Sequence, residues 1–154
     1  MKLSNKNKWW AIFFIAMALL SFFQWLNLRP VKIIAIHNSD NFSDILVDHF
    51  PLTVQGKISW WQKNKAMLKN RYGIPNASSN GGYHITFWLF GDGYMEQGKY
   101  DRLCFADMKT EKNCIEKNKA LTVDNSKNTG IFFTTHAGYY RINNKGEIVK
   151  KYFY

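Results

Sequence analysis

The sequence has little cysteine, little proline and few acidic residues. Its two Cys are too few for a disulfide-rich scaffold or for a zinc site of four thiolates. Its three Pro exclude a proline-rich linker protein. With 154 residues, 46% of them hydrophobic, the chain is too apolar to be disordered and too short for a two-domain enzyme. These limits suit a single folded domain.

One stretch near the N-terminus lacks charge altogether. Residues 9–28 contain three polar side chains and seven aromatic ones. Twenty helical residues rise about 30 Å, which is the thickness of the hydrocarbon core of a bilayer. Trp9, Trp10 and Trp25 lie near the ends of the stretch, where indole rings favour the membrane interface. The pattern predicts a transmembrane helix over residues 9–28.

A cleaved signal peptide is the main alternative for this stretch. Its apolar core would span about 7–15 residues and end in small side chains. Here the run is longer and passes into Phe22, Phe23 and Trp25, which are too bulky for that cleavage site. No Cys follows the run, which excludes a bacterial lipoprotein anchor. We therefore expect an uncleaved signal-anchor.

The flanking charges predict the orientation of this anchor. Lys2, Lys6 and Lys8 precede it, whereas Arg29 and Lys32 follow it. The bias favours a cytoplasmic tail over residues 1–8 and an exported region over residues 29–154, periplasmic if the anchor lies in a bacterial inner membrane. Leaving out the three N-terminal lysines, 18 basic residues face 11 acidic ones, so the exported region carries +7.

The exported region predicts an α+β domain, with a small antiparallel sheet and one main amphipathic helix packed on it. Runs rich in β-branched and aromatic residues, separated by Gly, Asn and Asp, indicate short strands. The expected strands cover residues 31–36, 44–50, 83–90, 103–105, 121–123, 131–135, 139–142 and 147–153. The expected helix covers residues 57–72, because Ile58, Trp61, Leu68 and Tyr72 recur at helical spacing. Gly73 and Pro75 then end it.

The two cysteines, Cys104 and Cys114, enclose nine residues. In an oxidising compartment such a pair forms a disulfide, which we expect here. A reactive thiol at Cys104 is the alternative, but no base is identifiable and the spacing is not the C-x-x-C of redox enzymes.

Candidate catalytic and metal-ligating groups are scattered. The four histidines (His37, His49, His84 and His136) have no metal-binding spacing, and we interpret them as isolated surface or turn residues. Asp92, Glu96 and Asp101 cluster loosely in a glycine-rich segment typical of a solvated hairpin. No G-x-S-x-G, P-loop or Rossmann motif is present. We expect no enzyme, no metal and no cofactor.

The predicted helix carries the most suggestive group of residues. Five basic side chains occur in it without an acidic one, interleaved with tryptophan. We single out Lys57, Trp60, Lys63, Lys65, Lys69 and Arg71 as a candidate partner-binding or lipid-binding group. Such a pattern also occurs on nucleic-acid surfaces, but export argues against a nucleic-acid partner. Anionic lipid headgroups or an acidic face of another protein remain as partners, beside the simpler interpretation of a solvated helix face.

Several segments together resemble a known family. They include RPVKIIAIH (residues 29–37), GKISWW (56–61) and, most distinctive, FGDGYMEQGKYDRLCFADMKTEKNC (90–114). The chain resembles an enterobacterial family of small inner-membrane proteins of unknown function, over nearly its whole length. The resemblance implies a location and no catalytic residues.

The sequence favours a non-catalytic, single-pass membrane protein whose exported domain binds another protein. An immunity protein that neutralises an envelope-acting toxin would have this architecture, and aromatic and Arg residues are common binding anchors. The alternative is an accessory structural subunit of a membrane or envelope complex. A hydrolase that uses Asp92, Glu96, Asp101 and His84 is a third hypothesis.

Overall fold

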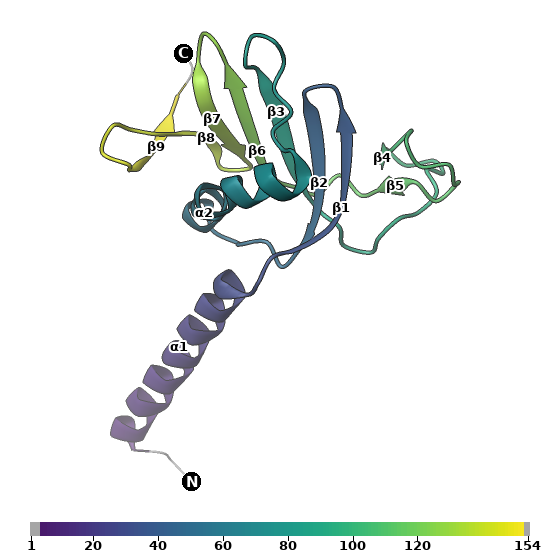
Figure 1. Ribbon diagram of the computed structural model, residues 1–154. Coiled ribbons are helices and arrows are strands. Elements are labelled where there is room, and N and C mark those ends of the chain that lie inside the picture. Colours follow the sequence, from purple (N-terminus) through teal and green to yellow (C-terminus); the bar gives the residue numbers. More distant parts are fainter. Residues whose placement is uncertain (1–3, 153–154) are drawn as a thin grey trace.

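The computed structural model describes residues 4–152, and its first element is a long helix that projects away from the rest (Figure 1). This helix, α1, spans Asn5–Leu28 and begins four residues before the predicted start. It is long and apolar enough to cross a membrane by length and composition, and none of its apolar window is buried within the protein. A helix that is apolar on all sides needs an apolar environment around it. Lys2, counted in the orientation prediction, lies outside the described residues.

Seven strands form the main sheet in the order β1-β2-β3-β6-β7-β8-β9, and two more form a small hairpin. Their bounds are β1 Lys32–Ser39, β2 Phe42–Asp48, β3 Tyr83–Leu89, β4 Leu103–Cys104, β5 Cys114–Ile115, β6 Lys119–Ser126, β7 Gly130–Thr135, β8 Gly138–Ile142 and β9 Ile148–Lys151. The predicted α+β class is confirmed. β5 was not expected, and Phe153, which the prediction put in the last strand, lies outside the described residues.

The sheet is antiparallel except for one pair of strands. β2 and β3 run parallel, with Ile45 opposite Phe87. Two neighbouring parallel strands need a crossover that carries the chain back to the end of the sheet at which the first strand began. Helix α2 (Val54–Tyr72) makes that crossover. The unit β2-α2-β3 thus holds α2 across one face of the sheet (Figure 1).

Both ends of α2 are fixed by local hydrogen bonds. The helix begins three residues earlier than predicted because Thr53 caps it, its Oγ1 accepting from the Gly56 amide at 3.0 Å. Gly73 ends it in the left-handed conformation (φ 70°), which suits glycine. Between these caps, Ile58, Trp61 and Leu68 pack on the sheet.

The sheet has a core on each of its faces. Ile45 and Val47 lie in the cluster under α2, whereas Leu46 between them lies in a second cluster on the opposite face. Because side chains alternate along a strand, this double burial explains the unbroken apolar run in β2. The second cluster is covered by residues 90–118, hereafter the excursion, which carries β4 and β5 and joins β3 to β6.

The last turn of α1 is bonded directly to the loop that precedes α2. Asn27 Oδ1 accepts from the backbone amides of Leu52 at 2.9 Å and Thr53 at 3.3 Å. Its Nδ2 donates to the carbonyl of Phe23 at 3.1 Å. Val31 already packs against the main core, so only residues 29 and 30 separate the helix from the folded domain. The junction is therefore short and bonded.

Candidate functional site

The exposed surface of α2 carries four cations without a carboxylate partner. Lys63, Lys65, Lys69 and Arg71, hereafter the α2 cations, are exposed and lie in the C-terminal half of the helix. Lys65 and Lys69 donate only to neutral oxygens, those of the Gln62 amide (3.2 Å) and the Pro75 carbonyl (2.9 Å). In the described residues none of the four forms an ion pair. Positive charge near a helix C-terminus is favourable, because the helix dipole is negative there.

The structure places the other two candidate residues of this helix differently. Lys57 is only 7% exposed, and desolvation by burial lowers its pKa. Trp60 is half-buried, with ring centroids 5.4 Å from Phe50 and 5.6 Å from Phe87. Both side chains turn toward the sheet, so they support the helix from within and do not belong to the exposed cations.

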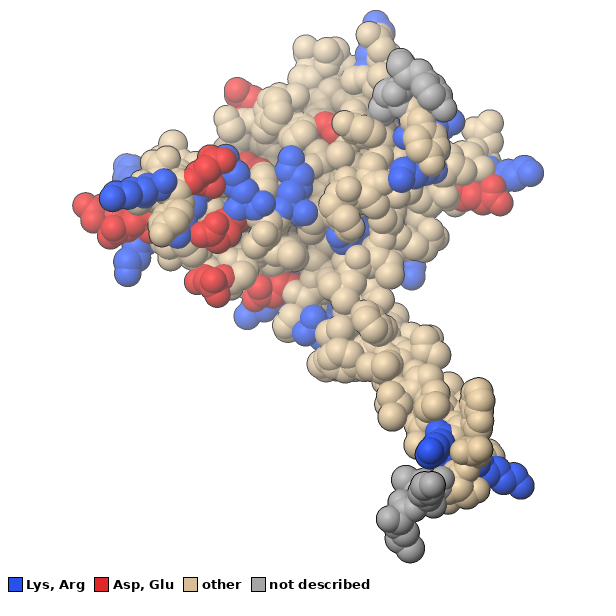
Figure 2. Space-filling model, turned by 180° about the vertical axis from the view of Figure 1, so that it is seen from behind, with Lys and Arg blue, Asp and Glu red and all other residues tan. Residues whose placement is uncertain are grey.

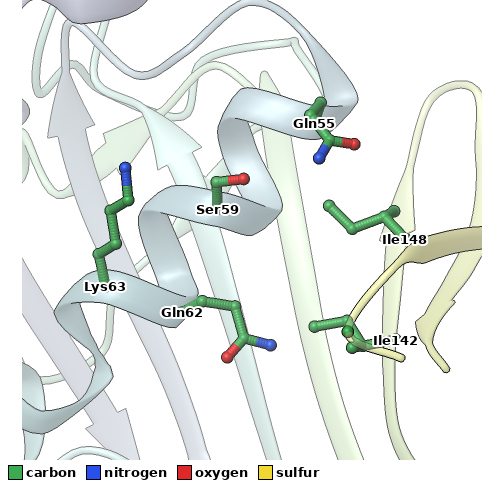
Figure 3. A pocket seen from close by; sticks show the side chains of 7 residues that line it. Gln55, Ser59, Gln62, Lys63, Ile142 and Ile148 are labelled. Atoms are coloured by element: carbon green, nitrogen blue, oxygen red, sulfur yellow. The ribbon is translucent and has the colours of Figure 1, made fainter. Parts of the chain in front are cut away.

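A groove separates α2 from the β8–β9 hairpin. Its volume is about 350 Å³, and Gln55, Ser59, Gln62 and Lys63 line one side while Ile142, Gly146 and Ile148 line the other. In Figure 3 the Gln55 and Gln62 side chains extend toward the two isoleucines. Ile142 and Ile148 also pack against the main core, which fixes the apolar side of the groove. The groove therefore has an apolar side, formed by the two isoleucines, and a positive charge at its rim, supplied by Lys63.

Acidic residues are concentrated away from α2. Six of the eleven lie in the excursion, and α2 itself has none. Figure 2 shows the lobe that carries β4 and β5 with positive and negative side chains beside one another, and α1 without charge along most of its length. The α2 cations therefore have no carboxylate on their own helix, and their positive charge favours an acidic partner.

The excursion is fastened to the sheet by His37 on β1. The His37 side chain bonds Asp107 through Nδ1 (2.7 Å) and Tyr94 through Nε2 (2.8 Å), and its ring stacks on Phe105 with centroids 3.8 Å apart. Because a carboxylate only accepts, Nδ1 donates to Asp107, and Nε2 shares the second hydrogen bond with the Tyr94 hydroxyl. Desolvation, together with the negative charge of Asp107, raises the pKa of Tyr94.

The disulfide lies within the excursion. Cys104 and Cys114 are joined, as predicted, and they are paired residues of β4 and β5. The reactive-thiol alternative is not supported, since neither sulfur is free.

His84 lies in a hydrogen-bonded chain of carboxylate, imidazole and hydroxyl. Its Nδ1 bonds Asp124, and its Nε2 lies 3.1 Å from Thr86 Oγ1. This order of groups occurs in nucleophilic triads. However, Thr86 is only 2% exposed, so a substrate carbonyl has no access to its hydroxyl. The arrangement supports the sheet and offers no nucleophile.

The three acids of the hydrolase hypothesis do not assemble around His84. Asp101 pairs with Lys117, and Asp92 and Glu96 are exposed. In residues 4–152 no group of three or more His, Cys, Asp or Glu side chains has the arrangement of a metal site.

Two features were missed by the sequence interpretation. His37 and His84 are not isolated, because each bonds a carboxylate far along the chain, and no local pattern signals such pairs. The groove was missed because its two sides come from distant segments. A signal did exist for Lys57: it stands four residues before Trp61 and eleven before Leu68, on the same helix face.

Comparison with known proteins identifies a family. The family model described as "Enterobacterial putative membrane protein (DUF943)" matches residues 2–152. No curated protein and no solved structure matches the chain.

Proposed function

The chain belongs to this enterobacterial family of putative membrane proteins, and from that premise we propose that it is a single-pass protein whose α+β domain binds an acidic protein at the membrane surface. The binding surface consists of the α2 cations and the groove between α2 and the β8–β9 hairpin. The observation that carries the proposal is the set of four exposed cations with no carboxylate partner in the described chain, beside an apolar slot. Apolar anchoring inside a charged rim is the usual anatomy of protein interfaces.

The placement of the groove supports a partner close to the bilayer. Gln55, at one end of the groove, is three residues from Leu52, whose amide is bonded to Asn27 of α1. We infer an inner-membrane location with the N-terminus cytoplasmic and residues 29–154 periplasmic, because lysines precede the span. The partner then meets the domain just outside the membrane.

Two roles are compatible with this surface. In the first, the domain is an immunity-type neutraliser, and the anchor keeps it where an envelope-acting toxin inserts. In the second, the protein is an accessory subunit of a membrane complex. The first is favoured, because α1 has bulky Phe and Trp side chains and lacks the small-residue seam that tight helix pairing uses.

The proposed role is non-catalytic. The buried hydroxyl of Thr86 and the separate placement of Asp92, Glu96 and Asp101 support this. Alanine variants of His84, Asp92, Glu96 and Asp101 should keep the cellular phenotype, and loss of the phenotype in any stably folded variant would favour a hydrolase.

Site-specific photo-crosslinking in cells tests the binding surface. A photo-reactive amino acid in place of Gln62, inside the groove, should capture one dominant protein identified by mass spectrometry. The same group at Lys127, an exposed position in the β6–β7 turn, should not. Lys63→Glu should reduce capture about tenfold, since like charges at an interface repel. Gln55→Trp should do the same by filling the groove.

Two controls keep this test specific. Lys127→Glu changes the net charge equally, and capture should stay at the wild-type level. If Lys127→Glu reduces capture as much as Lys63→Glu does, the attraction is non-specific and the proposed surface is wrong. Sensitivity of a deletion strain to a toxin then separates the two roles, because an accessory subunit gives no such sensitivity. Scrambling α1 at constant hydrophobicity should spare a tethered neutraliser and inactivate a subunit.

A further inference from the structure

A second open pocket lies at the ends of β3, β6 and β7, away from α2. It has a volume of about 390 Å³ and is lined by Leu89, Lys117, Asn118, Lys119, Thr134, Thr135 and His136. Thr134 lies on the sheet face opposite α2, because its neighbour Phe133 belongs to the core under that helix. None of the described residues that line this pocket is acidic. It is therefore separate from the groove proposed for the partner protein.

Two lysines line this pocket: Lys117 donates to Asp101, whereas Lys119 has no acceptor in the part of the chain that the structure describes. Lys119 forms no ion pair there, and its Nζ lies 5.3 Å from the centroid of Trp88. Trp88 is held in turn by its Nε1, which donates to Asp44 at 2.6 Å. The ammonium of Lys119 is thus positioned on a fixed ring and remains able to donate all three of its protons.

The neighbouring side chains add neutral donors. No hydrogen bond occupies the side chains of Asn118, Thr134 or His136 in residues 4–152. Thr122, the register partner of Thr134, has a buried hydroxyl that is also without a partner. Lys117 adds a second ammonium, which is shared with Asp101. Hydrogen-bond donors without acceptors, placed beside a cation, are suited to bind the oxygens of an oxyanion.

We propose that this pocket binds the phosphate group of an organic phosphate. The donors are more numerous than the two oxygens of a carboxylate can satisfy, whereas a phosphate offers three strong acceptor oxygens. The volume exceeds that of a bare phosphate and falls in the range of small-molecule sites. The phosphate is a monoester, which belongs either to the headgroup of phosphatidic acid or to a soluble phosphorylated compound, since both present three terminal oxygens.

Calorimetry on the full-length protein tests this site. The protein is held in nanodiscs of phosphatidylcholine and titrated with glycerol 3-phosphate, and saturable binding is expected. Lys119→Gln should weaken binding about tenfold, because a charge-assisted hydrogen bond is lost. Thr134→Val should weaken it about fivefold, as expected for a neutral hydrogen bond. Lys119→Arg, which keeps the charge, should bind more tightly than Lys119→Gln, whereas Lys127→Gln, which removes a charge elsewhere, should bind like wild type.

The lipid composition of the disc distinguishes the two sources of phosphate. In discs that contain phosphatidic acid, whose headgroup is a phosphomonoester, competition by the headgroup should weaken the apparent affinity for glycerol 3-phosphate in wild type, if lipid is the occupant. An unchanged affinity assigns the pocket to a soluble phosphate. The absence of saturable binding in both disc types, or equal weakening by Lys119→Gln and Lys127→Gln, would overturn the proposal.

Discussion

The imidazole of His37 lies parallel to the ring of Phe105, with centroids 3.8 Å apart and planes inclined by 9°. His37 belongs to β1, at the edge of the main sheet, and Phe105 belongs to the excursion. The stack joins two parts of the chain that share no main-sheet hydrogen bonds, and Asp107 and Tyr94 complete it from either side. These side chains fasten the excursion to β1 in addition to the apolar cluster beneath it, and their contribution can be tested one by one.

Tyr94→Phe removes the hydroxyl that bonds His37 and keeps the ring. We expect a loss of about 1 kcal/mol in the free energy of unfolding, the usual net value of one hydrogen bond. Amide exchange should rise at Met95 and Phe105 in the excursion and stay unchanged in β6. Uniform acceleration over the whole domain would contradict a local role.

Because the pKa of Tyr94 is raised in the folded wild type, the stability difference between wild type and Tyr94→Phe should depend on pH. A group whose pKa is higher in the folded state stabilises the fold fully below its unfolded pKa, here 10.0, and the contribution is lost as pH rises through the folded value. The stability difference between wild type and Tyr94→Phe should therefore be constant up to about pH 10 and shrink above it. Chemical unfolding at several pH values measures this difference.

Lys57→Met should stabilise the protein at neutral pH. Burial lowers the pKa of Lys57, so the unfolded chain binds its proton more tightly and the charged form opposes folding. Met has a similar length and no charge, and we expect a gain of about 1 kcal/mol at pH 7. The gain should decrease as pH rises toward the unfolded pKa of 10.5. Lys65→Met, on the exposed side, should change stability by less than about 0.5 kcal/mol.

Replacing both cysteines by serine should loosen the excursion more than the rest of the fold. The disulfide closes a loop with a sequence separation of 10, for which chain entropy predicts a loss of about 3 kcal/mol. Protease should then cut the excursion between the two positions before it cuts the sheet. A reductant should reproduce this pattern in wild type and have no effect on the double variant. Equal cutting rates in oxidised wild type and the double variant would argue against a constraining disulfide.

Asn27→Ala should weaken the bond between α1 and the domain. The variant removes the acceptor of the Leu52 and Thr53 amides, and their exchange should accelerate about fivefold. The Lys57 amide, bonded to the Thr53 carbonyl, should exchange as before. Asn27→Asp keeps an acceptor oxygen and should retain protection, so failure of both variants would point to a general disturbance of the helix end.

Local periodicity predicted most of the elements. The apolar run gave α1, the spacing of Ile58, Trp61 and Leu68 gave α2, and turn residues separated most of the strands. The observed ends of an element differ from the predicted ones where a residue outside the apolar pattern determines them. Thr53, which caps the start of α2, is an example. The parallel pairing of β2 and β3 depends on how α2 packs, which no strand pattern contains.

The candidate site could be predicted only in part. The α2 cations lie within nine residues of one another in the chain, so the sequence shows them as a charge pattern. The groove needs Ile142 and Ile148, which only the sheet order brings beside Gln62. The contact of His37 with Asp107 spans 70 residues, and nothing near either residue indicates the other.

The hydrogen bonds at Asn27 also couple the tilt of α1 to the orientation of the folded domain. A span that is longer than the local hydrocarbon thickness tilts within the bilayer. Because the helix end is bonded to the loop before α2, such a tilt turns the sheet with it. We therefore expect the angle at which the groove faces its surroundings to depend on membrane thickness, so that the same chain presents its surface differently in thin and thick bilayers.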